Sequence, residues 1–66
     1  MKISERILEL RKERNLTQAQ LASAIGVNAR AVSYWELNVN EPKASYIYNM
    51  AKFFGVSSDY LLGLED

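Results

Sequence analysis

Apolar residues recur at intervals of three and four along most of this 66-residue chain, which is the spacing of a buried helix face. Ile3, Ile7 and Leu10 follow it in the first segment, which Ser4 is predicted to cap and which ends near Arg14–Asn15. No useful run of alternating apolar and polar residues occurs, and no Asn-Gly or Asp-Gly hairpin turn. The pattern predicts an all-α fold.

Capping residues divide the remaining chain into four more helices. Thr17 and Gln20 form a capping-box pattern that starts the second helix, and Gly26 suits the left-handed conformation that ends it. Asn28 is the expected N-cap of a third helix over 29–36. The fourth helix has apolar positions Ala44, Ile47, Met50, Ala51 and Phe54 before Gly55, and Ser57 caps a short fifth helix with Tyr60 and Leu61 before Gly63.

One loop interrupts the helical spacing, in the sequence LNVNEPK at residues 37–43. It contains two asparagines and the only proline of the chain, both frequent in turns. Asn38 is expected to take the left-handed conformation at the end of the third helix, in place of glycine.

The second and third helices have the spacing of a helix-turn-helix over about 17–37, within a single domain of residues 1–66. Two helices joined by a three-residue turn cross steeply, so the residue at their closest approach must be small, and Ala22 meets this need. Gly26 supplies the positive φ angle that the turn requires. The positions predicted to bury the inner faces are Leu21, Ile25, Val27, Val32 and Trp35.

Composition excludes several kinds of chemistry. The chain has no cysteine and no histidine, so thiolate metal sites and the commonest general base are absent. Glu5 and Glu9 lie one helical turn apart, while Glu41 and Asp59 are isolated, and none has a catalytic partner. We therefore expect no enzymatic activity, cofactor, metal or small-molecule substrate. No apolar run approaches the roughly 20 residues of a membrane span, which predicts a cytoplasmic protein without a membrane partner.

Charge gives a mixed indication. Eight basic and eight acidic residues cancel over the chain. Residues 1–14 carry five basic and three acidic side chains, residues 15–43 two of each, and residues 44–66 one basic and three acidic. Nucleic-acid binders usually have a basic surplus, so the net charge argues mildly against DNA as the partner.

Three segments, LRKERNLTQAQLA, IGVNARAVSYWE and FFGVSSDYLLG, resemble the phage-repressor type of helix-turn-helix domain, the Cro and lambda-repressor-like family. The resemblance runs from about residue 3 to residue 64. It implies a compact five-helix domain that binds double-stranded operator DNA as a homodimer and regulates transcription as a repressor.

The resemblance also implies roles for individual residues. The third helix would be the recognition helix in the major groove, with Ala29, Arg30, Ser33 and Tyr34 facing the bases. Arg30 is the strongest candidate for direct reading, because a guanidinium can bridge two acceptors of guanine. Phosphate contacts, which fix the register, are then expected from Gln18, Asn28, Asn38, Asn40 and Lys43. Arg11 and Glu36 match an arginine and a glutamate that the family commonly pairs, and are expected to form a structural ion pair.

Several of these residues have a second interpretation. In this alternative, Arg30 would be a solvated surface arginine and Gln18 would only support the start of its own helix. Tyr34 would lie against its helix instead of touching DNA. Trp35 and Phe54 are expected in the core. Tyr46, Tyr48, Phe53 and Tyr60 present more aromatic surface than so small a core can bury. One interpretation is that some of them are half-buried with their hydroxyls in water. The other is that part of this set, together with Leu64, forms a homodimer patch.

Few cations are available for phosphate: Arg30 and Lys43, with Lys12 or Arg14 as further candidates. A monomer should therefore bind weakly, and two copies on a pseudo-palindrome, with half-site centres about 34–36 Å apart, would compensate. A protein-binding adaptor or antitoxin-like module of the same fold is the alternative, because the zero net charge and several tyrosines suit it.

Overall fold

A computed structural model describes residues 2–66, which form five helices and no strand. The helices are α1 (Lys2–Glu13), α2 (Gln18–Ile25), α3 (Ala29–Glu36), α4 (Ala44–Phe54) and α5 (Ser58–Leu62). The predicted all-α fold is confirmed. Within residues 2–66, no helix has the length and apolar character needed to cross a membrane.

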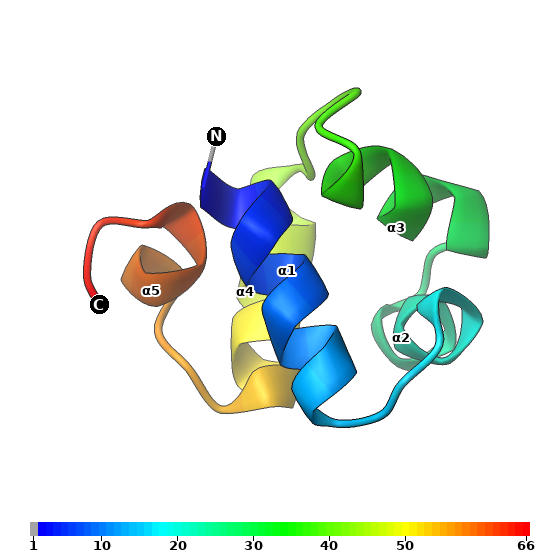
Figure 1. Cartoon of the computed structure of the whole chain (residues 1–66), viewed down its shortest axis with the longest axis horizontal. Helices are drawn as coiled ribbons and strands as arrows, with labels where there is room; N and C mark the ends of the chain where they lie inside the picture. The colour runs from blue at the N-terminus through cyan, green and yellow to red at the C-terminus, as the bar shows by residue number, and fades with distance from the viewer. Residues whose placement is uncertain (1) are drawn as a thin grey trace.

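The helices surround a single apolar core. α1 lies in the middle in front of α4, with α5 on one side and the α2–α3 pair on the other (Figure 1). Each helix contributes at least one fully buried side chain to the core. These side chains are Ile7, Leu21, Val32, Met50 and Leu61. The predicted core positions of α2 and α3 are buried, except that Val27 in the turn is only partly covered. Trp35 and Phe54 are buried, as predicted.

The predicted helix caps of the helix-turn-helix are present. The Thr17 hydroxyl accepts the Gln20 backbone N–H, and the Gln20 side chain accepts the Thr17 N–H, which completes the capping box. Gly26 has φ of 82° and donates its N–H to the Ala22 carbonyl. The Asn28 side chain accepts the Ala31 N–H at 2.9 Å. These local bonds fix both ends of the turn between α2 and α3.

The predicted start of the first helix is wrong. α1 already begins at Lys2, and Ser4 is a buried residue of its first turn instead of the cap. Ile3 is 2% exposed and, as a helical residue, lies on the same buried stripe as Ile7 and Leu10. We attribute the earlier start of the helix to this shared stripe, which includes Ile3 in the first turn.

The loop between α3 and α4 turns sharply at Asn38, which has the predicted positive φ, at 60°. The N–H of Val39 donates to the Tyr34 carbonyl at 2.9 Å, which is the wider of the two hydrogen bonds of a Schellman motif. The loop projects beyond the end of α3 (Figure 1) and then returns. Tyr46 of α4 consequently packs on Trp35 of α3, with 5.7 Å between ring centroids.

Candidate nucleic-acid interface

The steep packing of α2 against α3 leaves one side of α3 facing outward. Ala22 at the crossing is 2% exposed, so the inner faces are in close contact. Of the four predicted base-facing residues, Arg30 is exposed and Tyr34 is 39% exposed. Ala29 and Ser33 are only half-buried, so they present less surface than the sequence pattern suggests. The outward face of α3 is thus dominated by one guanidinium and one phenol ring.

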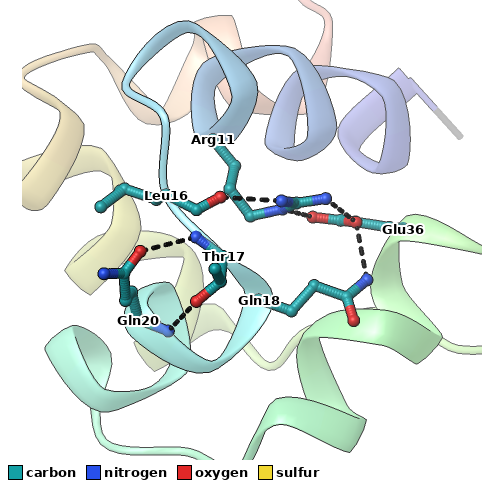
Figure 2. A network of polar contacts seen from close by, with 6 residues as sticks. All are labelled: Arg11, Leu16, Thr17, Gln18, Gln20 and Glu36. Atoms are coloured by element: carbon teal, nitrogen blue, oxygen red, sulfur yellow. Dashed lines mark hydrogen bonds and ion pairs between the residues drawn. The ribbon is translucent and has the colours of Figure 1, made fainter.

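A partly buried ion pair fixes the C-terminal end of α3. Arg11 donates from Nε to Oε2 of Glu36 at 2.6 Å and from Nη2 to Oε1 at 3.0 Å, a bidentate pair that confirms the prediction (Figure 2). The two side chains are 13% and 5% exposed. The hydrogen bond to Glu36 raises the pKa of the Arg11 guanidinium above its ordinary value, outweighing the lowering effect of burial.

The same carboxylate also binds the first residue of α2. Gln18 donates its side-chain N–H to Oε1 of Glu36 at 3.0 Å, while Arg11 donates to the Leu16 carbonyl at 2.8 Å (Figure 2). α1, the segment before α2, α2 and α3 are therefore joined by one set of hydrogen bonds. The sequence pattern did not predict this contact of Gln18. Its second amide N–H remains available, so a phosphate contact stays a prediction.

An open cleft of about 530 Å³ runs beside α3, between that helix and the loop that follows it. The rings of Trp35 and Tyr46 form part of its wall. Five predicted DNA-contacting residues line the cleft: Asn28, Arg30, Tyr34, Asn40 and Lys43. The other four, Gln18, Ala29, Ser33 and Asn38, lie outside it. The structure therefore brings the predicted recognition helix and the predicted phosphate-binding loop to one concave surface.

The described residues that line this cleft carry a net charge of +1. Arg30 and Lys43 are cationic, and Glu41 is the one acid among the described residues that line the cleft. Within residues 2–66 none of the three takes part in an ion pair, since the two pairs found are Arg11–Glu36 and Arg6–Asp66. All three charges are therefore free to act on a ligand in the cleft.

The Arg14 guanidinium, a further candidate for phosphate binding, is used elsewhere. Arg14 donates to the Phe54 carbonyl at 2.5 Å and to the Phe53 carbonyl at 3.5 Å, so it caps the C-terminal end of α4. Its guanidinium also lies 5.1 Å from the centroid of the Phe54 ring. Lys12 is exposed on α1. Among residues 2–66, the free cations that line the cleft are thus Arg30 and Lys43.

The aromatic residues outside the core divide into two groups. Tyr46 packs on Trp35, and Tyr60 lies half-buried under the Arg6 guanidinium, 4.3 Å from the ring centroid. Tyr48 and Phe53 on α4 are 59% and 42% exposed, and Leu64 in the C-terminal tail is 73% exposed. Of the residues predicted for the homodimer patch, Tyr46 and Tyr60 therefore pack against the core, while Tyr48, Phe53 and Leu64 remain exposed.

Sequence comparison gives a consistent result. A family model described as "Helix-turn-helix" matches residues 7–61. The HTH-type transcriptional activator BcrR of Enterococcus faecalis is 38% identical over 66 residues, which cover 100% of this chain and 32% of BcrR. Repressor protein C2 of Salmonella phage P22 is 37% identical over 60 residues, 91% of this chain and 28% of C2. The cryptic phage CTXphi transcriptional repressor RstR of Vibrio cholerae is 38% identical over 53 residues, 80% of this chain and 48% of RstR.

Solved structures have the same fold. The P22 c2 repressor protein in complex with a synthetic operator superposes with a TM-score of 0.85 and 36% identity, covering 89% of both chains. A transcriptional regulator from Listeria innocua gives a TM-score of 0.90 and 28% identity over 97% of this chain and 60% of that one. The present chain spans less than half the length of each of the three curated relatives named above.

Proposed function

Because this chain belongs to the helix-turn-helix family, we propose that it binds operator DNA as a homodimer and regulates transcription in the cytoplasm as a repressor. The observation that carries the proposal is the cleft beside α3, where the exposed Arg30 and the loop residues Asn40 and Lys43 share one surface. Repression needs only occupancy of the operator, which this surface provides without any catalytic group. The similarity to a repressor solved on an operator supports this function.

The proposed docking follows from the exposure of α3. The helix enters the major groove, which is wide enough to admit it, and Arg30 reads a guanine through its N7 and O6 acceptors. Tyr34, Ala29 and Ser33 face neighbouring bases. The backbone contacts that set the register come from Gln18, Asn28, Asn38, Asn40 and Lys43. The capped turn and the Glu36 ion pair hold α3 rigidly for this contact.

Selection of bound duplexes from a random pool tests the proposal. We expect a pseudo-palindrome whose half-site centres lie about 34–36 Å apart, or a multiple of one helical turn. Binding should weaken linearly with the logarithm of salt concentration. Because Lys43 is the cation assigned to phosphate and Arg30 is the other positive charge on the described lining of the cleft, the slope should be shallow, no steeper than about −2 per subunit.

The adaptor alternative predicts the opposite outcome in that experiment. A protein-binding module would retain no duplex from the pool at any salt concentration and would bind a protein partner tightly. A steep salt slope would instead show that phosphate contacts exceed those assigned to each subunit.

Dimer formation has a prediction of its own. Tyr48, Phe53 and Leu64 are exposed apolar side chains that lie outside α2 and α3, so they can be covered without blocking the recognition helix. We expect Leu64→Asp to shift the chain toward monomer in sedimentation equilibrium, because a charge desolvated at an interface is unfavourable. Leu37→Asp, at a similarly exposed leucine beside α3, is the control and should not change the oligomeric state. Equal effects of the two substitutions would contradict this assignment of the dimer surface.

A further inference from the structure

Glu41 is the one acidic residue on the cleft beside α3. We propose that Glu41 lowers the affinity of the cleft for the DNA backbone, so that its carboxylate restrains binding rather than contributing to it. This inference rests on the proposed DNA-binding function. It assigns to the loop after α3 a second role, opposite in sign to that of its neighbour Lys43.

The surroundings of the two acids near α3 differ sharply. Glu36 is 5% exposed and accepts hydrogen bonds from Arg11 and Gln18, so its charge is compensated and turned away from the outer surface. Glu41 is exposed, and no ion pair within residues 2–66 includes it. Between residues 15 and 43, Glu41 is therefore the acid whose charge remains uncompensated.

The position of Glu41 in the loop makes the repulsion unavoidable. Asn40 precedes it directly, Lys43 follows two residues later, and all three line the same cleft. A DNA strand whose phosphates contact Asn40 and Lys43 must pass the carboxylate between them. With Arg30 and Lys43 opposed by Glu41, the cleft keeps only one of its two positive charges in excess.

The physical signature of this repulsion is its dependence on salt. Exposed charges are screened over about 8 Å at physiological ionic strength and over about 30 Å at 0.01 M. Loss of the carboxylate should therefore strengthen DNA binding most at low salt. A role of Glu41 in folding alone would not show this dependence. Glu41 stands just before the N-terminus of α4, where a negative charge stabilises the helix slightly, so neutralising it should not increase stability.

Three variants test the proposal on the selected duplex. Glu41→Gln keeps the shape of the side chain and removes its charge, and it should bind roughly three- to ten-fold more tightly at 50 mM salt. That advantage should shrink as salt rises, which means a steeper salt slope than that of the wild type. Glu41→Asp retains the charge and should bind as the wild type does. Glu9→Gln makes the same change of net charge at an exposed position of α1, outside the cleft, and should change affinity less than two-fold.

The outcomes separate this inference from the function on which it rests. If the wild type binds and Glu41→Gln gains nothing, or Glu9→Gln gains as much, the role of Glu41 is wrong while DNA binding stands. If Glu41→Gln binds a duplex that the wild type fails to retain, the inference is supported in its strongest form. If neither protein binds any duplex, both proposals are overturned. Thermal unfolding of each variant should show a change of no more than a few degrees, which confirms that the binding differences come from charge.

Discussion

Replacing Glu36 with alanine is expected to lower the free energy of unfolding by about 3–5 kcal/mol. The substitution leaves the Arg11 guanidinium, whose side chain is 13% exposed, without the carboxylate that accepts two of its hydrogen bonds. Gln18 loses its acceptor at the same time. Arg11 then keeps only its hydrogen bond to the Leu16 carbonyl, and a largely buried charge that has lost its counter-charge is strongly destabilising.

So large an effect would leave little of the fold intact. A domain of this length has a total stability of roughly 3–10 kcal/mol, so Glu36→Ala should be largely unfolded or marginal at 25 °C. Urea unfolding followed by Trp35 fluorescence measures the change, since Trp35 lies in the core beside this position. Glu9→Ala, at an exposed carboxylate on α1, is the control and should change stability by less than about 0.5 kcal/mol. A loss below about 1 kcal/mol for Glu36→Ala would mean that the pair behaves as a solvated surface pair.

Replacing Arg30 with alanine should have the largest effect on operator binding. One bidentate contact with guanine contributes about 1–3 kcal/mol of discrimination, and the proposed dimer would make it twice. The expected loss is about 2–6 kcal/mol, or roughly thirty-fold to more than ten-thousand-fold in affinity for the selected operator. Binding to unrelated duplex should fall far less, because only one phosphate-attracting charge per subunit is removed.

Folding should not confound this measurement. Arg30 is exposed and makes no ion pair within residues 2–66, so the thermal midpoint of Arg30→Ala should stay close to that of the wild type. Arg30→Lys separates charge from geometry, since lysine keeps the positive charge and loses the planar fork. We expect it to recover nonspecific binding while recovering sequence preference only in part. Unchanged operator affinity in Arg30→Ala would show that another residue reads the sequence.

Local patterns in the sequence predicted most of the helix ends because the interactions that make them are local. Thr17 and Gln20 cap each other across one turn, and Asn28 accepts an N–H three residues away. Asn38 adopts positive φ in place of glycine through bonds to the last turn of α3. Ser4 shows the limit of this reasoning: its capping preference yielded to the tertiary contact of Ile3.

The candidate site was predictable only in part, because its geometry depends on contacts between distant segments. The Arg11–Glu36 pair followed from the family resemblance, but the attachment of Gln18 to the same carboxylate depends on the angle between α2 and α3. Glu41 is an isolated acid in the sequence. Its proposed effect on DNA binding depends on the loop, which folds back toward α3 so that Glu41 lines the open cleft. The local pattern predicted the turn at Asn38 but not where the loop comes to lie against α3.

The central claim is that the outward face of α3 enters the major groove with Arg30 on a guanine. Its most direct test is a double-mutant cycle on the selected operator, in which 7-deazaguanine removes the N7 acceptor of the assigned base. We predict that this base change weakens wild-type binding markedly and leaves Arg30→Ala binding almost unaffected, because the missing acceptor and the missing guanidinium belong to one contact. If the modified base weakens both proteins equally at every guanine of the half-site, Arg30 does not read guanine in the major groove.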